Sequence, residues 1–189
     1  VDAFKAQQAA NEAQNYFALL KQYSAELFDD GFSYHVGNLE GDITLVEFID
    51  YRCGYCKKAF QDLNELLEAD GNIRLILKEL PILGEASVAA SRFAVAVKQL
   101  YGADEYKRVH DALFSLLGQP TPTALSKISH KLDLDTDKIL DHMASNEVAE
   151  EISKTAKLAQ KMKIRGTPTF VMQDEMVRGY LPLESMPAM

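Results

Sequence analysis

Residues 43–56 have the sequence ITLVEFIDYRCGYC, and this stretch decides the fold class of the chain. Its first part is an almost continuous apolar run of strand length, which is typical of a strand buried on both faces of a sheet. A helix is expected at about 54–70, and a second apolar run follows at 73–78. Strand, helix and strand at this spacing predict a βαβ unit and therefore an α/β fold.

The chain beyond this unit predicts more helices and then a short hairpin. From residue 84 to residue 165 the apolar residues recur with helical periodicity, which predicts a helical insertion. The expected N-caps of its later helices are Thr121, Asp135 and Asn146. Two short apolar runs at 166–172 and 176–179, split by a polar turn, then predict a β-hairpin.

The leading segment, residues 1–30, is rich in Ala, Gln and Glu and is expected to form one helix. Its apolar stripe, with coiled-coil spacing, consists of Ala6, Ala9, Ala13, Tyr16, Leu20, Tyr23 and Leu27. The stripe either packs on its own domain or reaches another subunit and forms a homo-oligomer. The chain begins at Val1 rather than Met, which suggests that a signal peptide or a tag was removed.

The composition is that of an ordinary globular protein. The chain has 189 residues, of which 47% are hydrophobic and 25% are charged, so disordered and coiled-coil-only proteins are excluded. The net charge is −8, and the basic residues are spread among acidic ones. We therefore expect no nucleic-acid partner. No apolar run approaches the roughly 18–20 residues that span a bilayer.

The chain has two cysteines, Cys53 and Cys56, at the junction between the predicted strand and the predicted helix. A disulfide between them would close a loop too small to stabilise a scaffold. Backbone N–H groups at a helix N-terminus stabilise a thiolate, so we expect Cys53 to be a nucleophile with a lowered pKa. Cys56, one turn into the helix, is expected to resolve the mixed disulfide that Cys53 forms with a substrate.

Two other interpretations of the cysteine pair stay open. Such a pair can supply half of a zinc site, but the sequence has no second pair. The histidines are scattered singly, at His35, His110, His130 and His142. The cysteines can also be inert buried thiols. We expect redox chemistry and no metal site.

The motif Cys53-Gly54-Tyr55-Cys56 after a buried strand, the helical insertion, and Gly166-Thr167-Pro168 before a hairpin together resemble the DsbA-like thiol:disulfide oxidoreductases of the thioredoxin superfamily. The resemblance covers roughly residues 34–180. It implies a thioredoxin fold with an inserted helical domain and an N-terminal helix. The expected divisions are 1–33 for the N-terminal helix, 34–83 for the first half of the thioredoxin fold, 84–163 for the insertion and return helix, and 164–189 for the second half.

The resemblance assigns further residues to the site. Pro168 would be cis and lie against the cysteines, whereas the alternative is a plain trans turn proline. Thr167 would pair through its backbone with an extended substrate beside Cys53. Gly54 and Tyr55 would also contact the substrate.

Glu47 is anomalous in an apolar strand. By resemblance it matches a buried acid of DsbA-like proteins, and Lys78 matches a lysine on the adjacent strand. Glu47, its pKa raised by burial, would accept the proton that Cys56 loses, and Lys78 is a second candidate catalytic residue. The alternatives are a structural ion pair between Glu47 and Lys78, or an acid at the wet end of the strand.

The activity that the resemblance implies is disulfide exchange on protein substrates, as a DsbA-like oxidase or a DsbC- or ScsC-like isomerase. The Cys53–Cys56 disulfide would be the redox centre without an external cofactor, and a membrane redox partner would reset it. The expected location is the bacterial periplasm or cell envelope. The alternatives are a redox-inactive thioredoxin-fold binding or chaperone module and a glutathione-dependent reductase. Family members usually end in a helix, for which residues 180–189 look too short.

Overall fold

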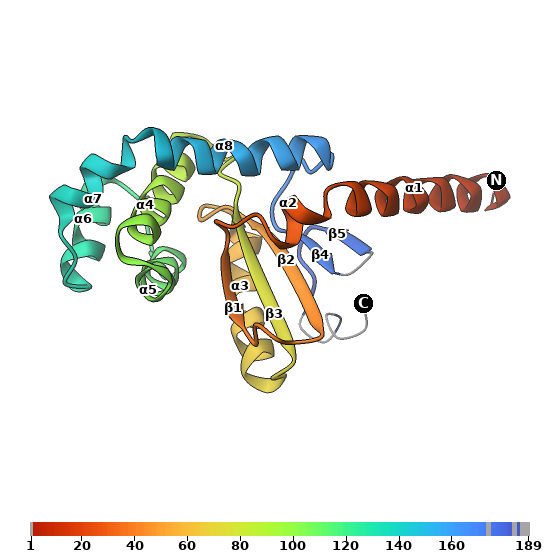
Figure 1. Cartoon of the computed structure of the whole chain (residues 1–189), viewed down its shortest axis with the longest axis horizontal. Coiled ribbons are helices and arrows are strands. Elements are labelled where there is room, and N and C mark those ends of the chain that lie inside the picture. Colours follow the sequence, from red (N-terminus) through yellow and green to blue (C-terminus); the bar gives the residue numbers. More distant parts are fainter. Residues whose placement is uncertain (1, 173–174, 183–184, 186–189) are drawn as a thin grey trace.

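The computed structural model contains one five-stranded mixed sheet with helices on both faces (Figure 1). It describes residues 2–172, 175–182 and 185. The strands are β1 (Tyr34–Gly37), β2 (Ile43–Ile49), β3 (Ile73–Glu79), β4 (Thr169–Met172) and β5 (Glu175–Arg178). Their order is β1-β3-β2-β4-β5; β2 and β3 are parallel, and the other neighbouring pairs are antiparallel. The predicted βαβ unit and terminal hairpin are therefore confirmed.

The helices fall into a leading pair, a helix inside the βαβ unit and a block between β3 and β4. They are α1 (Asp2–Gln22), α2 (Ser24–Phe28), α3 (Gly54–Ala69), α4 (Glu85–Tyr101), α5 (Ala103–Phe114), α6 (Pro122–Lys131), α7 (Thr136–Met143) and α8 (Asn146–Lys161). The inserted helices lie at one side of the sheet, and α8 runs from them back across it (Figure 1). The α/β fold with an inserted helical block is thus confirmed.

Successive side chains of each strand point to opposite faces of the sheet, so the apolar residues form two clusters, one on each face. The larger cluster joins β2 and β3 to α3 and the inserted helices, and it contains both cysteines. The smaller one joins the opposite face to Leu20 of α1, Leu27 of α2 and the end of α8. The sheet core is therefore covered on one face by α3 and on the other by segments distant in sequence.

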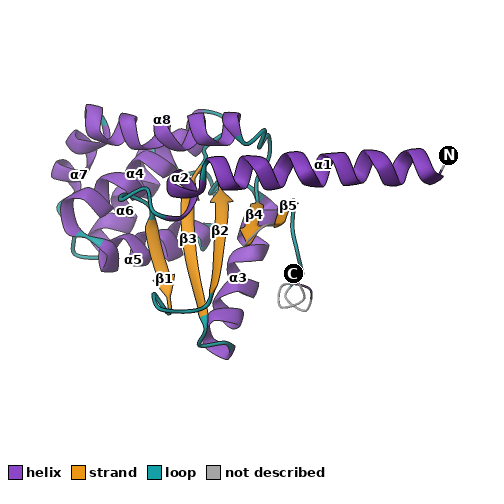
Figure 2. Ribbon diagram, turned by 45° about the vertical axis from the view of Figure 1, so that its right-hand side comes forward, coloured by secondary structure: helices purple, strands orange, loops and turns teal. Residues whose placement is uncertain are grey.

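The leading segment differs from the expected single helix. It breaks at Tyr23 into α1 and α2, and α1 projects away from the body of the molecule (Figure 2). Leu20 and Leu27 are buried in the chain's own core, so the end of the apolar stripe packs on its own domain. This part of the stripe is thus unavailable to another subunit.

Local capping signals account for the boundaries of the later helices. Thr121 and Asp135 accept hydrogen bonds from the backbone N–H groups three residues ahead, as expected for N-caps. The cap expected at Asn146 is instead Ser145, whose side chain accepts from the N–H of Val148. The expectation of a reduced final helix falls largely on residues outside those described.

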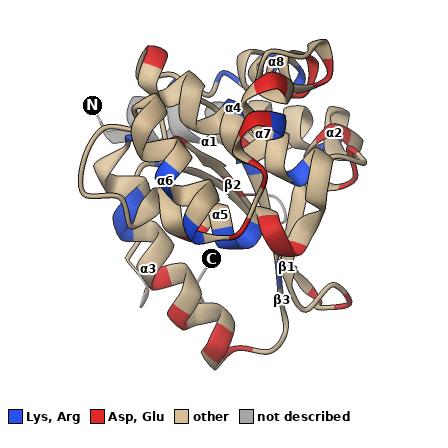
Figure 3. Cartoon of the chain, turned by 90° about the vertical axis from the view of Figure 1, so that its left-hand side faces the viewer, with Lys and Arg blue, Asp and Glu red and all other residues tan. Residues whose placement is uncertain are grey.

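Acidic residues outnumber basic ones, and the two kinds are interspersed over much of the chain. Acidic residues are frequent toward the far end of α3, while Lys and Arg lie among acidic residues on the inserted helices (Figure 3). Within the described residues, no helix is both long enough and apolar enough to cross a membrane.

Candidate active site

Cys53 occupies the N-cap position of α3, just beyond the carboxyl end of β2, which is the central strand of the sheet. Its Sγ accepts a hydrogen bond from the backbone N–H of Cys56 at 3.2 Å, and its thiol donates to the carbonyl oxygen of Thr167 at 3.1 Å. The backbone N–H of Cys53 donates to the carbonyl of Asp50 at 3.0 Å. The sulfur atom is therefore fixed between a helix N-terminus and the strand that returns from the insertion.

The two thiols are both reduced and have opposite electrostatic environments. The hydrogen bond with Cys56 is the main influence that lowers the pKa of Cys53 from its usual 9 to about 6, and burial opposes it. Burial raises the pKa of Cys56 far above its usual value, and the hydrogen bond with Cys53 and the charge of Glu47 add to the rise. Near neutral pH, Cys53 is thus a thiolate while Cys56 keeps its proton.

Thr167 lies beside Cys53 although it follows it by more than a hundred residues in sequence. The peptide bond between Thr167 and Pro168 is cis. β4 starts directly after them and pairs with β2 in antiparallel register. The first residues of β4 therefore lie next to the carboxyl end of β2. The sheet topology therefore explains how two distant segments form one site.

Glu47 lies behind the cysteines on the same face of the sheet. It is 2% exposed, and its Oε1 has no hydrogen-bond partner among the described residues. It lines a small apolar pocket with Phe60 and Leu63 of α3 and with Leu77. Burial, and secondly the charge of Cys53, raise the pKa of Glu47 well above its usual value. The side chain is therefore ready to hold a proton.

Lys78 does not join this group. Glu47 pairs in register with Leu77, so Lys78 points to the opposite face of the sheet. There its Nζ donates to Asp30 at 2.6 Å and to Ser33 at 3.0 Å. The interpretation of Glu47 and Lys78 as an ion pair is wrong, because the partner of Lys78 is Asp30. The interpretation of Glu47 as a solvent-exposed acid at the end of the strand is also wrong, because Glu47 is buried.

A groove of about 320 Å³ opens beside Cys53 and Gly54. Its far wall comes from the end of α5 and the following loop, including Leu116, Leu117 and Pro120. Tyr55 is 65% exposed on the other side of the motif, where its ring stacks on Tyr180 at 6.2 Å between centroids. The reactive sulfur is thus reached from a groove formed partly by the helical insertion.

Two parts of this site were missed by the sequence analysis. Asp50 lies in the stretch 43–56 and received no predicted role, although its carboxylate accepts backbone hydrogen bonds from Arg52, Ile82 and Leu83. The loop at 116–120 carries no motif, and only the tertiary fold brings it to the groove. An acid that ends a buried apolar strand was the one available signal for Asp50.

Comparison with known proteins places the chain in a family. The sequence profile of the DSBA-like thioredoxin domain matches residues 44–187, which include every member of the site. The chain belongs to this family. The expected thioredoxin-like fold is confirmed by solved structures of DSBA-like proteins as well. One is the thiol-disulfide exchange protein α-DsbA2 from Wolbachia pipientis, 27% identical, with a TM-score of 0.86 over 94% of this chain and 95% of that chain.

Two further relatives show how widely this domain is used. A thioredoxin-like oxidoreductase from Silicibacter pomeroyi DSS-3 is 38% identical, with a TM-score of 0.81 over 87% of this chain and 93% of that chain. Na(+)/H(+) antiporter NhaA 1 from Salinispora arenicola (strain CNS-205) is 32% identical over 80% of this chain. The chain spans only 23% of the length of that antiporter. The DSBA-like domain therefore also occurs as part of larger proteins.

No group of three or more His, Cys, Asp or Glu side chains that could hold a metal ion occurs within the described part of this DSBA-like domain.

Proposed function

We propose that this chain catalyses thiol–disulfide exchange on protein substrates, with Cys53 as the attacking or attacked sulfur. The observation that carries the proposal is the position of Cys53 Sγ, which contacts the backbone N–H of Cys56 and the carbonyl of Thr167. The N–H group of Cys56 donates to this sulfur and stabilises a thiolate, which is the reactive form in exchange, while the contact with Thr167 places the sulfur beside the start of β4. Membership of the DSBA-like family supports the same conclusion.

Oxidation of a substrate would proceed in two displacements. A substrate thiolate attacks Cys53 in the Cys53–Cys56 disulfide; a substrate–Cys53 bond forms, the bond to Cys56 breaks, and Cys56 leaves as a thiolate. A second substrate thiolate then attacks the first substrate sulfur and releases Cys53 as a thiolate. The substrate loses two electrons and two protons; the protein gains both electrons and one proton, on Cys56, while Cys53 stays a thiolate near neutral pH and the other proton goes to solvent. A membrane redox partner would remove those electrons.

Glu47 would manage the proton of Cys56. A thiolate at Cys56 is unstable because the site is buried, so a proton must arrive as this sulfur leaves and must depart before it attacks. Glu47 has a raised pKa and an unpaired oxygen on the same face of the sheet, which suits both transfers. We do not assign Lys78 to this step, because it is bonded to Asp30 on the opposite face.

The remaining predicted residues would place the substrate. Thr167, which precedes the cis Pro168, contacts Cys53, and Gly54 lines the groove that opens beside Cys53. Backbone groups before a strand can pair with an extended chain, which is a recognition mode that tolerates many sequences. Tyr55, exposed at the rim, would add apolar contact area.

The lowered pKa of Cys53 favours transfer of the disulfide to substrate, because it stabilises the reduced protein. The Gly54-Tyr55 dipeptide and Thr167 resemble the pattern of DsbC-type disulfide isomerases and ScsC-like proteins, and this resemblance supports isomerase activity. Oxidase and isomerase activity use the same displacements, so the chemistry at Cys53 is common to both. Two refolding assays, one on a reduced and one on a scrambled substrate, separate them. Persistent disulfides form in exported proteins, which supports a periplasmic or cell-envelope location.

Refolding of ribonuclease tests the activity and its direction. The oxidised protein should restore activity to reduced ribonuclease, and the reduced protein should rescue scrambled ribonuclease if it is an isomerase. Cys56→Ser should accumulate a mixed disulfide on Cys53, whereas Cys53→Ser should form none. Full activity of Cys53→Ser would show that the chain is a binding or chaperone module instead.

We also propose that the projecting part of α1 mediates self-association. The end of the helix packs on the chain itself, but its first part extends beyond the body (Figure 2). Light scattering of the full chain and of a chain that lacks residues 1–14 tests this, because Leu20 stays in both. A monomer in both cases would rule out association through α1.

A further inference from the structure

Buried polar side chains extend from Glu47 toward the helical insertion, and the exchange steps at the two cysteines do not use them. Glu47 of β2 and Glu79 of β3 lie on the same face of the sheet, since Glu47 pairs in register with Leu77. His110 of α5 lines a pocket together with Glu47 and Leu77 on this face. Two carboxyl groups and one imidazole, all buried, therefore share one region of the core.

A continuous chain of hydrogen bonds connects His110 to Glu79. The hydroxyl of Tyr51 donates to Oε1 of Glu79 at 2.8 Å and lies 3.0 Å from Nδ1 of His110. A hydroxyl has one hydrogen atom, which Tyr51 gives to Glu79, so Nδ1 of His110 carries a hydrogen and donates it to Tyr51. The network thus assigns the Nδ1–H form of the ring while Glu79 is a carboxylate.

The second ring nitrogen of His110, Nε2, is consequently an acceptor. Burial, and secondly the charge of Lys107, lower the pKa of His110 to about 3, so the ring is neutral near pH 7. A neutral imidazole with its hydrogen on Nδ1 has a lone pair on Nε2. Among the described residues, Nε2 has no hydrogen-bond partner. His110 can therefore take up a hydrogen at Nε2 while it gives one away at Nδ1.

The pocket that Glu47 and His110 share can admit one water molecule. Its volume is about 10 Å³, which is close to the space that a single water molecule needs. Its other polar lining residues are Asn64 and Lys107. Oε1 of Glu47 has no hydrogen-bond partner among the described residues. A water molecule that enters the pocket can therefore join an unpartnered atom of Glu47 to an unpartnered atom of His110.

We propose that His110 and Tyr51 form a proton relay between the two buried carboxyl groups, with one water molecule between Glu47 and the imidazole. The inference rests on the exchange activity and the role of Glu47 proposed above, and it extends them. Nε2 of His110 takes a hydrogen while Nδ1 gives its own to Tyr51, and the hydroxyl of Tyr51 gives its own to Glu79. The imidazole and the phenol stay neutral throughout.

The complete step balances. In the mixed disulfide, Cys56 loses its proton to Glu47 and its sulfur attacks Cys53; the Cys53–Cys56 bond forms, and the substrate leaves as a thiolate with the electron pair of the broken bond. Glu47 passes a proton into the relay, and one arrives at Glu79. When a substrate thiolate later opens the disulfide, the hydrogens shift back and Cys56 is protonated as it leaves.

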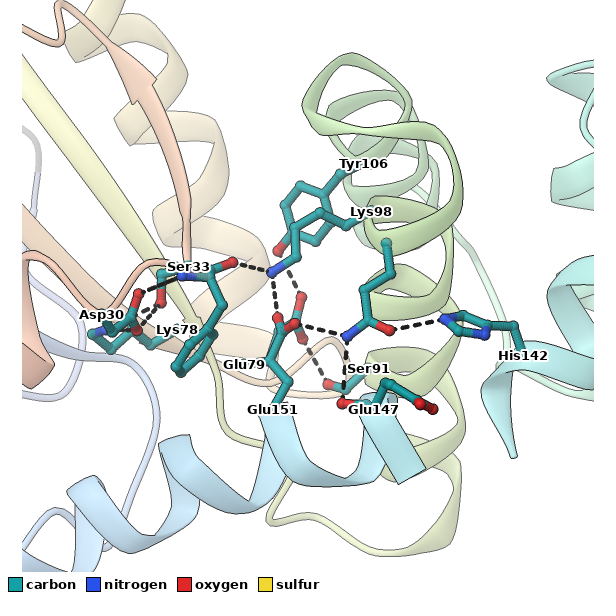
Figure 4. A network of polar contacts seen from close by, with 12 residues as sticks. Asp30, Ser33, Lys78, Glu79, Ser91, Lys98, Tyr106, His142, Glu147 and Glu151 are labelled. Atoms are coloured by element: carbon teal, nitrogen blue, oxygen red, sulfur yellow. Dashed lines mark hydrogen bonds and ion pairs between the residues drawn. The ribbon is translucent and has the colours of Figure 1, made fainter. Parts of the chain in front are cut away.

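The charges at the two ends of the relay suit transfer in both directions. Burial raises the pKa of Glu47 well above its usual value and that of Glu79 to about 7. A carboxyl group that already holds a proton can accept another only if it passes its own on, which the relay allows. The groups that act on Glu79 are the hydroxyls of Tyr51, Ser91 and Tyr106 and the ammonium of Lys98 (Figure 4).

Reaction of the reduced protein with dipyridyl disulfide tests the relay. The Cys53 thiolate releases one thiopyridone as the mixed disulfide forms, and attack by Cys56 releases a second, so stopped-flow absorbance records two phases. His110→Phe keeps an aromatic ring without its nitrogens, and Tyr51→Phe lacks the hydroxyl. Each should slow the second phase by about 10-fold relative to the first, a smaller effect than loss of Glu47, the first proton acceptor.

Tyr106→Phe provides the matched control. Tyr106 donates to the same oxygen of Glu79 at 2.6 Å and stacks on His110, but no relay step passes through its hydroxyl. The second phase of this variant should reach the wild-type rate at high pH. Its pH midpoint should move upward, because the hydrogen bond from Tyr106 lowers the pKa of Glu79.

The pH profile of the second phase gives a readout that a structural role would not move. The wild-type rate should rise through about pH 7, as Glu79 becomes a carboxylate that can accept a proton. Glu79→Gln keeps the shape of the side chain but cannot accept a proton, so it should lack this rise.

The outcomes separate the relay from the activity on which it rests. Wild-type protein that releases no second thiopyridone would overturn exchange through both cysteines. Second phases of His110→Phe and Tyr51→Phe that are as fast as that of Tyr106→Phe would overturn the relay alone. An unchanged pH profile in Glu79→Gln would also overturn it. If His110→Phe does not fold, Tyr51→Phe breaks the same relay at its next member and decides the question.

Discussion

At the scale of single residues, the two cysteines differ most in how they hold a proton. Cys53 has a pKa of about 6, and Cys56 is protonated throughout the neutral range. A lowered pKa stabilises the folded reduced protein above pH 9, the usual value, and this contribution is lost as the pH falls through about 6. The pH window from 6 to 9 therefore controls the relative stability of the dithiol and the disulfide.

Thiolate absorbance measured against pH provides the first prediction. The reduced wild-type protein should show one transition with a midpoint near pH 6, which disappears in Cys53→Ser. Urea unfolding should show the reduced form gaining stability over the oxidised form from pH 6 to pH 9. A midpoint near 9 would contradict the stabilisation of the Cys53 thiolate by the N-terminus of α3.

Replacement of Glu47 should raise the stability of the fold and slow the decay of the mixed disulfide. The buried Oε1 of Glu47 is unsatisfied, and such a group costs about 1–3 kcal/mol of folding free energy. Glu47→Leu should therefore raise the free energy of unfolding by about that amount, since a buried apolar side chain of similar size replaces it. The same variant should slow the decay of the mixed disulfide by about 10²-fold, because Cys56 loses its proton acceptor. Stopped-flow decay at an unchanged rate would remove Glu47 from the mechanism.

At the scale of elements, Glu79 joins the sheet to the helical insertion. Its carboxylate accepts from Tyr106 of α5 at 2.6 Å and from Ser91 of α4 at 2.7 Å, and both contacts are drawn in Figure 4. Tyr51, two residues before Cys53, also donates to it at 2.8 Å. Burial raises the pKa of Glu79 to about 7, although these three hydrogen bonds oppose the rise. The link between β3, α4 and α5 therefore changes charge near neutral pH.

The sign of this titration predicts how stability depends on pH. The folded state holds the Glu79 proton more tightly than the unfolded state, where the pKa is near 4.5. Glu79 therefore lowers the free energy of unfolding as the pH rises from 4.5 to 7, by about 3 kcal/mol in all. Glu79→Gln keeps the shape without the charge and should lack this loss. Urea unfolding of both proteins at pH 5 and pH 8 measures the difference, and equal pH dependence would contradict it.

A second contact between elements involves Lys98 of α4. Its ammonium binds Glu151 of α8 (Figure 4). It also donates to the carbonyl of Phe32, which lies in the segment before β1. Gln99, next to it, donates to Glu151 at 3.0 Å. The insertion, its return helix and the leading segment thus meet at one cluster.

The sequence was most informative where the signals are local. The strand at 43–49, the helix at 54–69 and the cap at Thr121 follow from runs, spacing and capping residues. β1 was missed because four residues carry too short a pattern. Ser145 and Asn146 are both good capping residues, so the sequence does not distinguish them. Local signals of this kind predict where helices and strands lie in the sequence, but they do not predict which strands pair in the sheet.

The errors at the candidate site arose from long-range pairing. Whether Glu47 and Lys78 share a face depends on the register of β2 against β3, and a slip of one residue reverses it. The partner of Lys78, Asp30, is a loop residue without a motif. The contacts of Asp50 with backbone N–H groups leave no trace in the side-chain sequence. The cysteines and Thr167 could be predicted as site residues because their motifs are local in the sequence and do not depend on strand pairing.

At the scale of the whole molecule, the buried pair of Lys78 and Asp30 attaches the leading segment to the sheet. The two side chains are 1% and 7% exposed. Burial alone raises the pKa of Asp30, but the hydrogen bond and charge of Lys78 together outweigh it and lower that pKa. Its stabilising contribution is therefore present above pH 3.8, the usual value, and is lost only as the pH falls through the lowered value.

Asp30→Asn should lower the free energy of unfolding at pH 7 by about 3–5 kcal/mol, because it leaves a buried ammonium without its counter-charge. Glu150→Gln provides the matched control, since its ion pair with Lys154 is 66% and 54% exposed. That control should change stability by about 0.5 kcal/mol or less. Urea unfolding of the two variants compares them, and equal effects would show that burial of the Asp30 pair has no energetic weight.

The Asp30–Lys78 contact also bears on how this domain is joined to other proteins. The family profile starts at residue 44, after β1 and after Asp30. A gene fragment cut at that boundary would lose an edge strand and the counter-ion of Lys78 while keeping every active-site residue. A domain that keeps β1 and the counter-ion of Lys78 therefore starts upstream of the stretch that the family profile matches, and fusion junctions in larger relatives should fall before the equivalent of Asp30.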